Sequence, residues 1–462
     1  MKLLPPAALL ERLTSRLELL TAGARDAPER QQTMRAAIEW SYRLLEPSEQ
    51  ELFAELSVFV GGASLEAIEA VCSGDVLEGL GALVDNSLLR RVDAAEPRFR
   101  MLEVVREYAL ERLAASGREE EARARHADFL LALAVRAEPE FEGAESERWL
   151  ALMDRELPNM RAALDRAIAA QDERVLRSTG ALRRFFQLRG HLEEGRRRLE
   201  TALAAVEGDP LDRAVALHGA AMQAGDQGDF DAAERLFRES LEIVRAEGNT
   251  TRIASTMSNI ANLAFFRGEL EEAIALYEEA AALHESTGEY ARSATVLENL
   301  GTARMLAGDA ERAIQIYEES LERARAGGRT RQVASTLRAL ARALIQLGEV
   351  ARARAAVDEA IGIEQALGDR HGLADGLEIR GAVAGAEGDH ERTAVLWGAA
   401  AALRESIGSR RHPDQPQWYE GVEESARAAL GPDAFAAAVA RGRGLEPAEA
   451  VAYAINGSNS SD

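Results

Sequence analysis

Through the second half of the chain, glycines, small side chains and large apolar side chains recur every forty residues. One glycine series runs from Gly228 to Gly388, and a second, offset by twenty residues, runs from Gly248 to Gly408. A fixed period between about twenty and fifty residues is typical of stacked-repeat proteins, whose units pack on their neighbours. The nineteen residues between successive glycines are enough for a helix of about four turns and its connection. The pattern therefore predicts a row of helical hairpins.

The side chains around the first glycine series follow a common register. Seven residues before each glycine, and five and twelve residues after it, the side chain is small. Nine residues after it stands a larger apolar side chain: Phe237, Tyr277, Tyr317, Val357 and Trp397. Small side chains let two helices approach closely, and a large one fills the gap between hairpins. We expect the glycines to end helices in the left-handed conformation, and the acidic residues that follow them to favour the next helix N-terminus.

These offsets resemble those of the tetratricopeptide repeat over residues 209–410. The resemblance implies an all-α fold, a right-handed α-solenoid of long helical hairpins. Two features depart from the family: the period is 40 rather than about 34 residues, and its closing proline is missing. A degenerate earlier unit starts at Gly190 within a helical connector over 119–208. We expect a helical cap over 411–455 and a disordered tail over 456–462.

In tetratricopeptide arrays the first helix of each hairpin lines the concave face. The resemblance therefore implies a groove for a partner or ligand, lined by side chains of three successive first helices: Asn259, Asn262, Phe265, Asn299, Thr302, Met305, Arg338, Arg342 and Ile345. Amide and guanidinium groups beside apolar side chains suit an extended peptide or a small ligand. The alternative is that Phe265 and Met305 are core residues and that the polar side chains are merely solvated.

The first half of the chain has a different pattern. Amphipathic spacing predicts a helix over 31–45, a second opened by a capping box at 48–51, a third from Ser64 to Cys72, and a fourth over 76–86. Two strand-like runs follow, over 87–92 and 98–102, around a polar turn. Helices followed by a short hairpin predict a winged-helix domain over 26–118.

The same region resembles a known family. Five segments, 29–33, 40–42, 57–62, 83–89 and 102–109, look like the winged-helix part of bacterial STAND-type regulatory ATPases. These are the LuxR-like, SARP-like and cyclase-linked regulators. In that family an ATPase module precedes the winged helix, and the repeats sense an inducer. The resemblance implies that residues 1–25 are a remnant of the end of that module.

The composition disfavours a nucleotide-binding loop, a metal site and catalytic residues in this chain. Lys2 is the only lysine, so 54 of the 55 basic residues are arginine, and no Gly-x-x-x-x-Gly-Lys phosphate loop exists. We therefore expect no cofactor in this chain, and ATP or ADP only if an ATPase module is supplied upstream. The seven histidines are scattered, so a metal site has little support, and Cys72 lies in an apolar stretch typical of an inert buried thiol. We expect no catalytic residues and no enzymatic activity.

Charge argues against nucleic acid as a partner. The formal net charge is −23, and residues 26–118 hold 10 arginines against 17 acidic residues. The expected recognition helix, Leu77 to Asn86, has no basic residue, although Arg90, Arg91, Arg98 and Arg100 on the wing are able to reach phosphates or an acidic protein surface. DNA contact by this chain is therefore disfavoured, and the charge also disfavours an anionic membrane.

These observations predict a cytoplasmic, non-catalytic sensor or scaffold of a bacterial signal-transduction or transcriptional regulator. Its partner would be a protein, a peptide or a small inducer held in the repeat groove, together with a separate ATPase module. Two alternatives stay open. The winged helix acts as the DNA-binding domain of a transcriptional regulator, or the chain is one part of a split ATP-dependent STAND switch.

Overall fold

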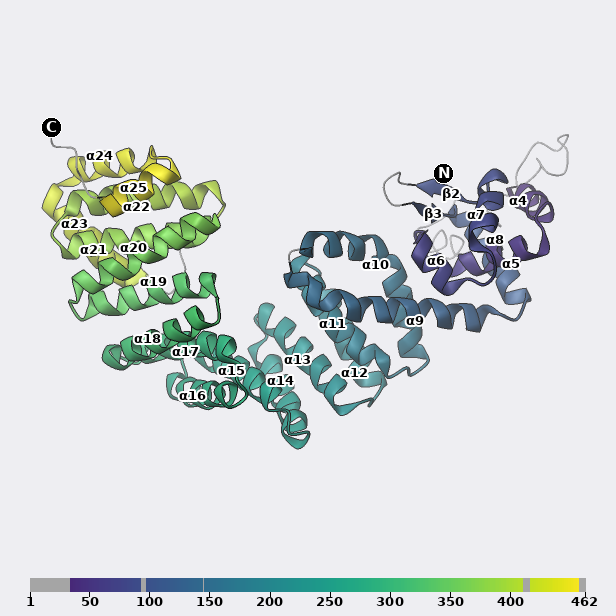
Figure 1. Cartoon of the computed structure of the whole chain (residues 1–462), viewed down its shortest axis with the longest axis horizontal. Helices are drawn as coiled ribbons and strands as arrows, with labels where there is room; N and C mark the ends of the chain where they lie inside the picture. Colours follow the sequence, from purple (N-terminus) through teal and green to yellow (C-terminus); the bar gives the residue numbers. More distant parts are fainter. Residues whose placement is uncertain (1–33, 93–96, 144, 410–415, 457–462) are drawn as a thin grey trace, which may run out of the picture. The chain divides into compact units, whose positions relative to one another are not determined.

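The computed structural model describes residues 34–92, 97–143, 145–409 and 416–456 (Figure 1). The predictions for 1–25 and for 457–462 lie outside these residues. The chain divides into two compact units, which meet in sequence at Ser240 and Leu241. Each unit is described by itself. Within the described residues, no helix combines the length and the apolar character that crossing a membrane requires.

The first unit begins with a small helical domain that carries a three-stranded antiparallel sheet. Its helices precede, separate and follow three short strands in the order β1-β3-β2, so β3 is central. The elements are α4 (Met34–Arg43), α5 (Pro47–Glu55), the 3-10 turn η1 (Leu56–Val58), β1 (Ala63–Ser64), α6 (Leu65–Val71), α7 (Val76–Asp85), β2 (Arg90–Val92), β3 (Arg98–Arg100) and α8 (Glu103–Ala115). This is the winged-helix arrangement that the sequence predicts.

Several local predictions need correction. The capping box lies two residues earlier than expected: Glu46 is the N-cap of α5, Pro47 opens the helix, and the Glu46 backbone N–H donates to Glu49 at 2.8 Å. Proline suits the first helical turn because its missing N–H would have no partner there. Both predicted strands are also shorter. The first begins only at Arg90, because residues 87–89 form a turn on which Leu88 and Leu89 are buried, and the second ends at Arg100.

The apolar faces of these helices meet in one core. Phe53, Ile68 and Leu83 are almost fully buried, and they come from three different helices. Tyr42 and Tyr108 add tilted and edge-on ring contacts around Phe53. Aromatic pairs at these separations stabilise beyond the area they bury.

A helical connector completes the first unit. It comprises α9 (Glu119–Ala137), η2 (Glu138–Glu142), α10 (Ser146–Ala169), α11 (Arg174–Leu188) and α12 (Leu192–Ala205). The predicted repeat region then begins with α13 (Pro210–Asp226) and α14 (Phe230–Ala246), and α14 crosses the boundary between the two units. Gly190 has a φ of 72° between α11 and α12, and Leu199 and Ala202 are buried. The degenerate unit expected at Gly190 is therefore a helical hairpin.

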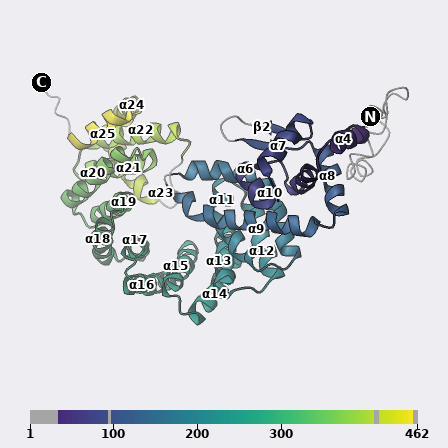
Figure 2. The ribbon, with the colours of Figure 1, turned by 45° about the vertical axis from the view of Figure 1, so that its right-hand side comes forward.

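The second unit is a stack of helical hairpins followed by three shorter helices (Figure 2). The hairpins pair α15 (Thr250–Phe266) with α16 (Leu270–Ser286), α17 (Tyr290–Leu306) with α18 (Ala310–Ala326), α19 (Thr330–Gln346) with α20 (Val350–Leu367), and α21 (Arg370–Ala386) with α22 (His390–Ser406). The first helices also contact each other, α15 with α17, α17 with α19, and α19 with α21. The all-α repeat fold is confirmed.

The glycine register has the structural cause that the sequence predicts. All ten glycines of the two series have φ between 64° and 87°, a region that other residues rarely adopt. The small positions allow close approach: a Cβ on Gly301 would lie 2.6 Å from the Tyr317 ring, and one on Gly381 would lie 2.6 Å from the Trp397 ring. The acidic residues after the glycines behave unequally. Asp309 and Asp389 accept a backbone N–H as N-caps, whereas Glu269 and Glu349 do not.

Three helices close the second unit: α23 (Pro416–Leu430), α24 (Pro432–Arg443) and α25 (Pro447–Asn456). Helix α24 packs on α22 so closely that a Cβ on Gly442 would lie 1.9 Å from the Val395 carbonyl oxygen. Helix α25 contacts α20, α21 and α22. Asn456, expected to begin the tail, is instead the last residue of α25.

Candidate functional site

All nine residues of the predicted groove lie on the three neighbouring helices α15, α17 and α19, which we call the first-helix face. Each is partly exposed and none is fully buried. Because these helices contact each other in sequence order, the nine side chains come from one continuous row of helices. The structure therefore brings the predicted residues onto adjacent elements.

The amide and hydroxyl groups of this face are held by hydrogen bonds within and between hairpins. Asn262 accepts from the Tyr277 hydroxyl at 2.6 Å and from the Asn299 side chain at 3.2 Å, and donates to Asn259 at 3.5 Å. Thr302 and the Tyr317 hydroxyl lie 3.1 Å apart. In both hairpins the ring nine residues after the glycine thus orients the polar side chain six residues before it.

Burial changes the acidity of these rings. It raises the pKa of Tyr317 to about 12, while the hydrogen bond with Thr302 and the positive charge of Arg342 act in the opposite direction. Burial also raises the pKa of Tyr277. Both phenols are therefore neutral donors at physiological pH and are suited to orienting neighbouring groups rather than to acid–base chemistry.

The two arginines of the face have different surroundings. Arg338 forms an ion pair with Asp375, and its Nε lies 2.9 Å from a carboxylate oxygen of Glu364. Burial raises the pKa of Glu364 to about 8 despite Arg338. Arg342, one turn further along α19, has no ion pair or hydrogen bond with any residue that the structure describes, and its Nε is buried without an acceptor.

The apolar members of the face are partly structural. Met305 and Ile345 pack against the core of the second unit, and Phe265 contacts the Phe266 ring edge-on. Sequence reasoning missed Glu298 on α17, which accepts hydrogen bonds from Ser335 at 2.7 Å and Thr336 at 2.5 Å on α19. Its only signal was a polar residue next to Asn299.

The winged-helix domain presents a mixed surface. On α7, the expected recognition helix, Leu77, Glu78, Gly81 and Asp85 are exposed, so the face that would enter a groove of DNA is apolar and acidic. On the wing, Arg90, Arg91 and Arg100 are exposed. Specific DNA binding normally combines a basic footprint with base-reading side chains, and α7 offers neither.

Arg98 corrects the prediction made for the wing arginines. Only 8% of it is exposed, and it forms an ion pair with Glu156 of α10 and donates to the Gly62 carbonyl at 3.0 Å. The fully buried Asn159 completes this contact, because it accepts from the Val60 backbone N–H at 2.6 Å and donates to Gly62 at 2.9 Å. These bonds fix the wing and the diglycine loop to the connector.

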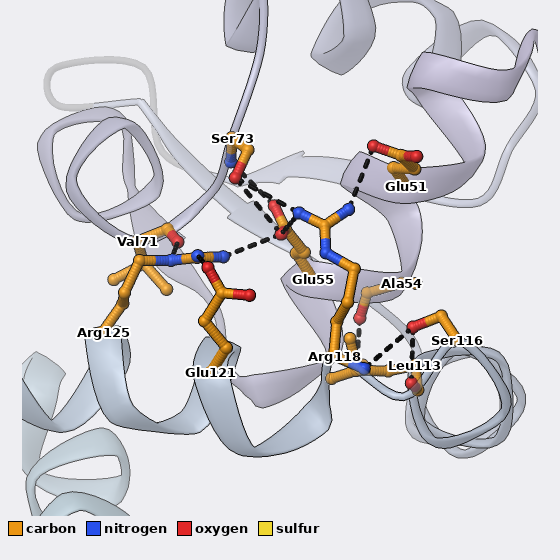
Figure 3. A network of polar contacts seen from close by, with 11 residues as sticks. Glu51, Ala54, Glu55, Val71, Ser73, Leu113, Ser116, Arg118, Glu121 and Arg125 are labelled. Atoms are coloured by element: carbon orange, nitrogen blue, oxygen red, sulfur yellow. Dashed lines mark hydrogen bonds and ion pairs between the residues drawn. The ribbon is translucent and has the colours of Figure 1, made fainter.

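A second buried network joins the other end of the domain to α9 (Figure 3). The carboxylate of Glu55, whose residue is 1% exposed, lies 2.6 Å from Arg118 and 2.7 Å from Arg125, and it accepts from the Ser73 backbone N–H at 2.7 Å. Removing one member would leave a buried charge without its partner, which is costly. The winged helix and the connector are therefore joined at two separate polar contacts.

Groups that often perform chemistry are not gathered in the described residues. They contain no group of three or more His, Cys, Asp or Glu side chains placed to hold a metal ion. The Cys72 thiol is buried, and this burial raises its pKa. A thiol with a raised pKa is a poor nucleophile.

Comparison with known families agrees with both parts of the fold. Residues 45–114 match the winged helix-turn-helix domain family. Three overlapping stretches, 212–286, 252–326 and 292–366, match the tetratricopeptide repeat family.

Two mycobacterial proteins are similar to part of the chain. A Mycobacterium tuberculosis protein with the provisional name HTH-type transcriptional regulator is 38% identical over 200 residues, which cover 41% of this chain. An uncharacterised protein of the same species is 33% identical over 135 residues, covering 28% of this chain and 34% of that protein. The chain spans about a fifth (22%) of the length of the first of these relatives.

Among solved structures, one similar chain is a Signal Transduction ATPase with Numerous Domains protein with a tetratricopeptide repeat sensor from Pyrococcus horikoshii. It shares 18% identity at a TM-score of 0.49, covering 98% of this chain and 69% of that chain. The family matches and the observed elements show that the chain carries a winged helix-turn-helix domain followed by tetratricopeptide repeats.

Proposed function

We propose that this chain is the non-catalytic sensing and coupling part of a bacterial, cytoplasmic regulator. A protein, a peptide or a small inducer binds to the first-helix face, and the winged helix passes the signal on. The observation that carries the proposal is the row of oriented, partly exposed polar side chains on α15, α17 and α19. Tetratricopeptide repeats elsewhere serve as interaction scaffolds, and the provisional name of the mycobacterial relative points to gene regulation.

The coupling role rests on the first unit. A freely tethered winged helix would need no buried ion pairs to its connector, whereas this one has two such contacts, around Glu156 and around Glu55. A winged helix held in this way moves together with the connector, so a displacement of the connector also displaces the winged helix. As in the STAND-type regulators that the sequence resembles, a separate ATPase module is the expected recipient.

Binding to the first-helix face is tested with paired variants. Asn262→Ala and Asn299→Ala remove the amide pair of α15 and α17, and Gln315→Ala on the exposed side of α18 is the control. Pull-down from the native cell and thermal-shift screening of small metabolites should give a partner that the amide variants lose and the control keeps. A partner retained equally by all three variants would contradict the proposal.

DNA binding through the winged helix is the second candidate, favoured by the exposed Arg90, Arg91 and Arg100 and by the family match. A gel shift on duplex DNA at rising salt decides it. Genuine binding through phosphates weakens steeply with salt and is lost when the three arginines become alanine. Because α7 is acidic and apolar on its exposed side, we expect no shift at physiological salt.

A further inference from the structure

The three hairpins whose first helices form the first-helix face differ at one position of that face. Six residues before the turn glycine stand Asn262, Thr302 and Arg342 in three successive hairpins. Nine residues after it stand Tyr277, Tyr317 and Val357. In the first two hairpins the tyrosine hydroxyl contacts the polar side chain, at 2.6 and 3.1 Å. In the third the valine has no polar group to offer.

Arg342 consequently has no acceptor in its own hairpin. Its Nε is shielded from solvent and has no hydrogen-bond acceptor, and no carboxylate of the described residues lies within ion-pair distance of its guanidinium. Other partly or fully buried arginines of this unit are matched: Arg338 by Asp375, Arg380 by Asp358, and Arg404 by Glu378. Arg342 differs from these three arginines because no carboxylate of the described residues pairs with it.

The nearby acceptors are already engaged. Asp375, on α21, is shared by Arg338 and Arg404, and the Tyr317 hydroxyl is held by Thr302. Glu364 lies against Arg338 on the other side. Burial raises the pKa of Glu364 to about 8, so this carboxyl is largely uncharged at neutral pH. None of these carboxylates lies within ion-pair distance of the Arg342 guanidinium, so geometry leaves its charge unpaired among the described residues.

We propose that Arg342 binds a carboxylate of an acidic peptide, which lies along the first-helix face with its backbone against the amides of Asn262 and Asn299. A guanidinium with an unused edge recognises a carboxylate by charge-assisted hydrogen bonds. The amides supply the donors and acceptors that an extended chain needs. This inference rests on the proposed function and narrows its partner to one chemical class.

Panning a random peptide library displayed on phage against the full chain tests the inference without presupposing a sequence. Selected peptides that compete for the first-helix face should be enriched in Asp and Glu. Arg342→Gln should weaken their binding about tenfold or more, and Arg342→Lys should retain part of it. Arg312→Gln, which changes an exposed arginine on α18, should leave binding unchanged. Arg342→Glu should shift the selection towards basic peptides.

The outcomes separate this inference from the proposed function. Peptides that Asn262→Ala weakens but that show no acidic enrichment, or that bind Arg342→Gln equally well, would overturn the role of Arg342 and leave the binding face standing. Failure to select any peptide that Asn262→Ala weakens would overturn the inference, and the pull-down and thermal-shift screen would then decide the proposed function. If Arg342→Gln lowers the melting temperature, the test is made by changing the peptide. Exchanging the Asp and Glu of the peptide for Asn and Gln must then weaken its binding to the unaltered chain.

Discussion

Two buried titratable residues, one in each unit, respond to pH in opposite directions. His126 on α9 is 3% exposed and packs edge-on against Phe59, and burial lowers its pKa to about 4. Glu364 on α20 is 1% exposed, and burial raises its pKa to about 8. Both shifts have the same cause, because a low-dielectric interior disfavours the charged form of either group.

For His126 we expect the first unit to lose stability under mild acid. The unfolded chain takes up a proton near pH 6.5, whereas the folded chain resists protonation until about pH 4. Between these values the stability of the first unit falls as the pH is lowered, and the loss reaches about 2 kcal/mol at pH 5. Hydrogen exchange of α9 at pH 7 and pH 5 measures this loss. His126→Leu should flatten the dependence, and His371→Gln, an exposed histidine, should not.

For Glu364 the sign is reversed. The folded state keeps a proton that the unfolded state releases above about pH 4.5, so stability falls as pH rises towards 8. Glu364→Gln, which mimics the neutral carboxyl, should protect α20 and α21 from hydrogen exchange at pH 8 by about 4 kcal/mol relative to the unaltered chain. The two should differ little near pH 5. Equal protection at pH 8, or the same gain in the exposed control Glu359→Gln, would contradict the assignment.

At the scale of helices and strands, the repeat helices and the docking of the winged helix differ in how far apart in sequence their determining residues lie. The repeat helices follow directly from local patterning, since each is bounded by a left-handed glycine. The docking contacts do not, because their members are far apart in sequence: Arg98 and Glu156 are separated by 58 residues, and Glu55 and Arg125 by 70. Nothing in the local pattern distinguishes these residues from the many solvated Arg and Glu side chains.

Breaking the wing contact should cost far more than breaking a surface ion pair. Glu156→Ala leaves the buried Arg98 without its carboxylate, and we expect the first unit to lose about 3–5 kcal/mol. Glu120, whose side chain is 82% exposed, pairs with Arg166, and Glu120→Ala should cost about 0–1 kcal/mol. Urea unfolding of the full chain, together with hydrogen exchange of α8 and α10, compares the stability losses of the two variants. Similar costs would show that the wing is not held by this pair.

The crossing of α22 and α24 depends on a glycine. A Cβ at Gly442 would overlap the Val395 carbonyl, so Gly442→Ala should push the helices apart and destabilise the C-terminal helices by about 1–3 kcal/mol or more. Gly444→Ala, two residues on, would meet nothing closer than 3.5 Å and serves as the control. Thermal unfolding measures both. An equal effect of the two substitutions would refute the crossing.

At the scale of the whole molecule, charge and composition restrict the ligands. With one lysine and no phosphate loop, the chain should not respond to nucleotide. Addition of ATP and magnesium should leave the melting temperature unchanged, whereas a ligand at a hundred times its Kd would add about 2.7 kcal/mol. A shift with ATP that ADP and phosphate do not reproduce would require a nucleotide site that the sequence does not reveal.

The sequence by itself determined the repeat architecture and the register of its turns. A left-handed turn is a local requirement that only glycine meets easily, and close helix packing needs small side chains at fixed offsets, so both leave a periodic trace. The sequence also predicted the winged helix, although two details differed. The capping box lies earlier because Pro47 opens α5, and the first strand begins later because Leu88 and Leu89 are buried on a turn.

Only the tertiary structure decided which charged side chains meet. It placed Arg98 in a buried ion pair instead of on the surface of the wing, and it left Arg342 without a partner because the neighbouring acceptors serve other arginines. Each described α-helix carries an arginine or a glutamate, so their pairing depends on which helix faces pack together. That information is non-local, and the pattern of residues along one element does not contain it.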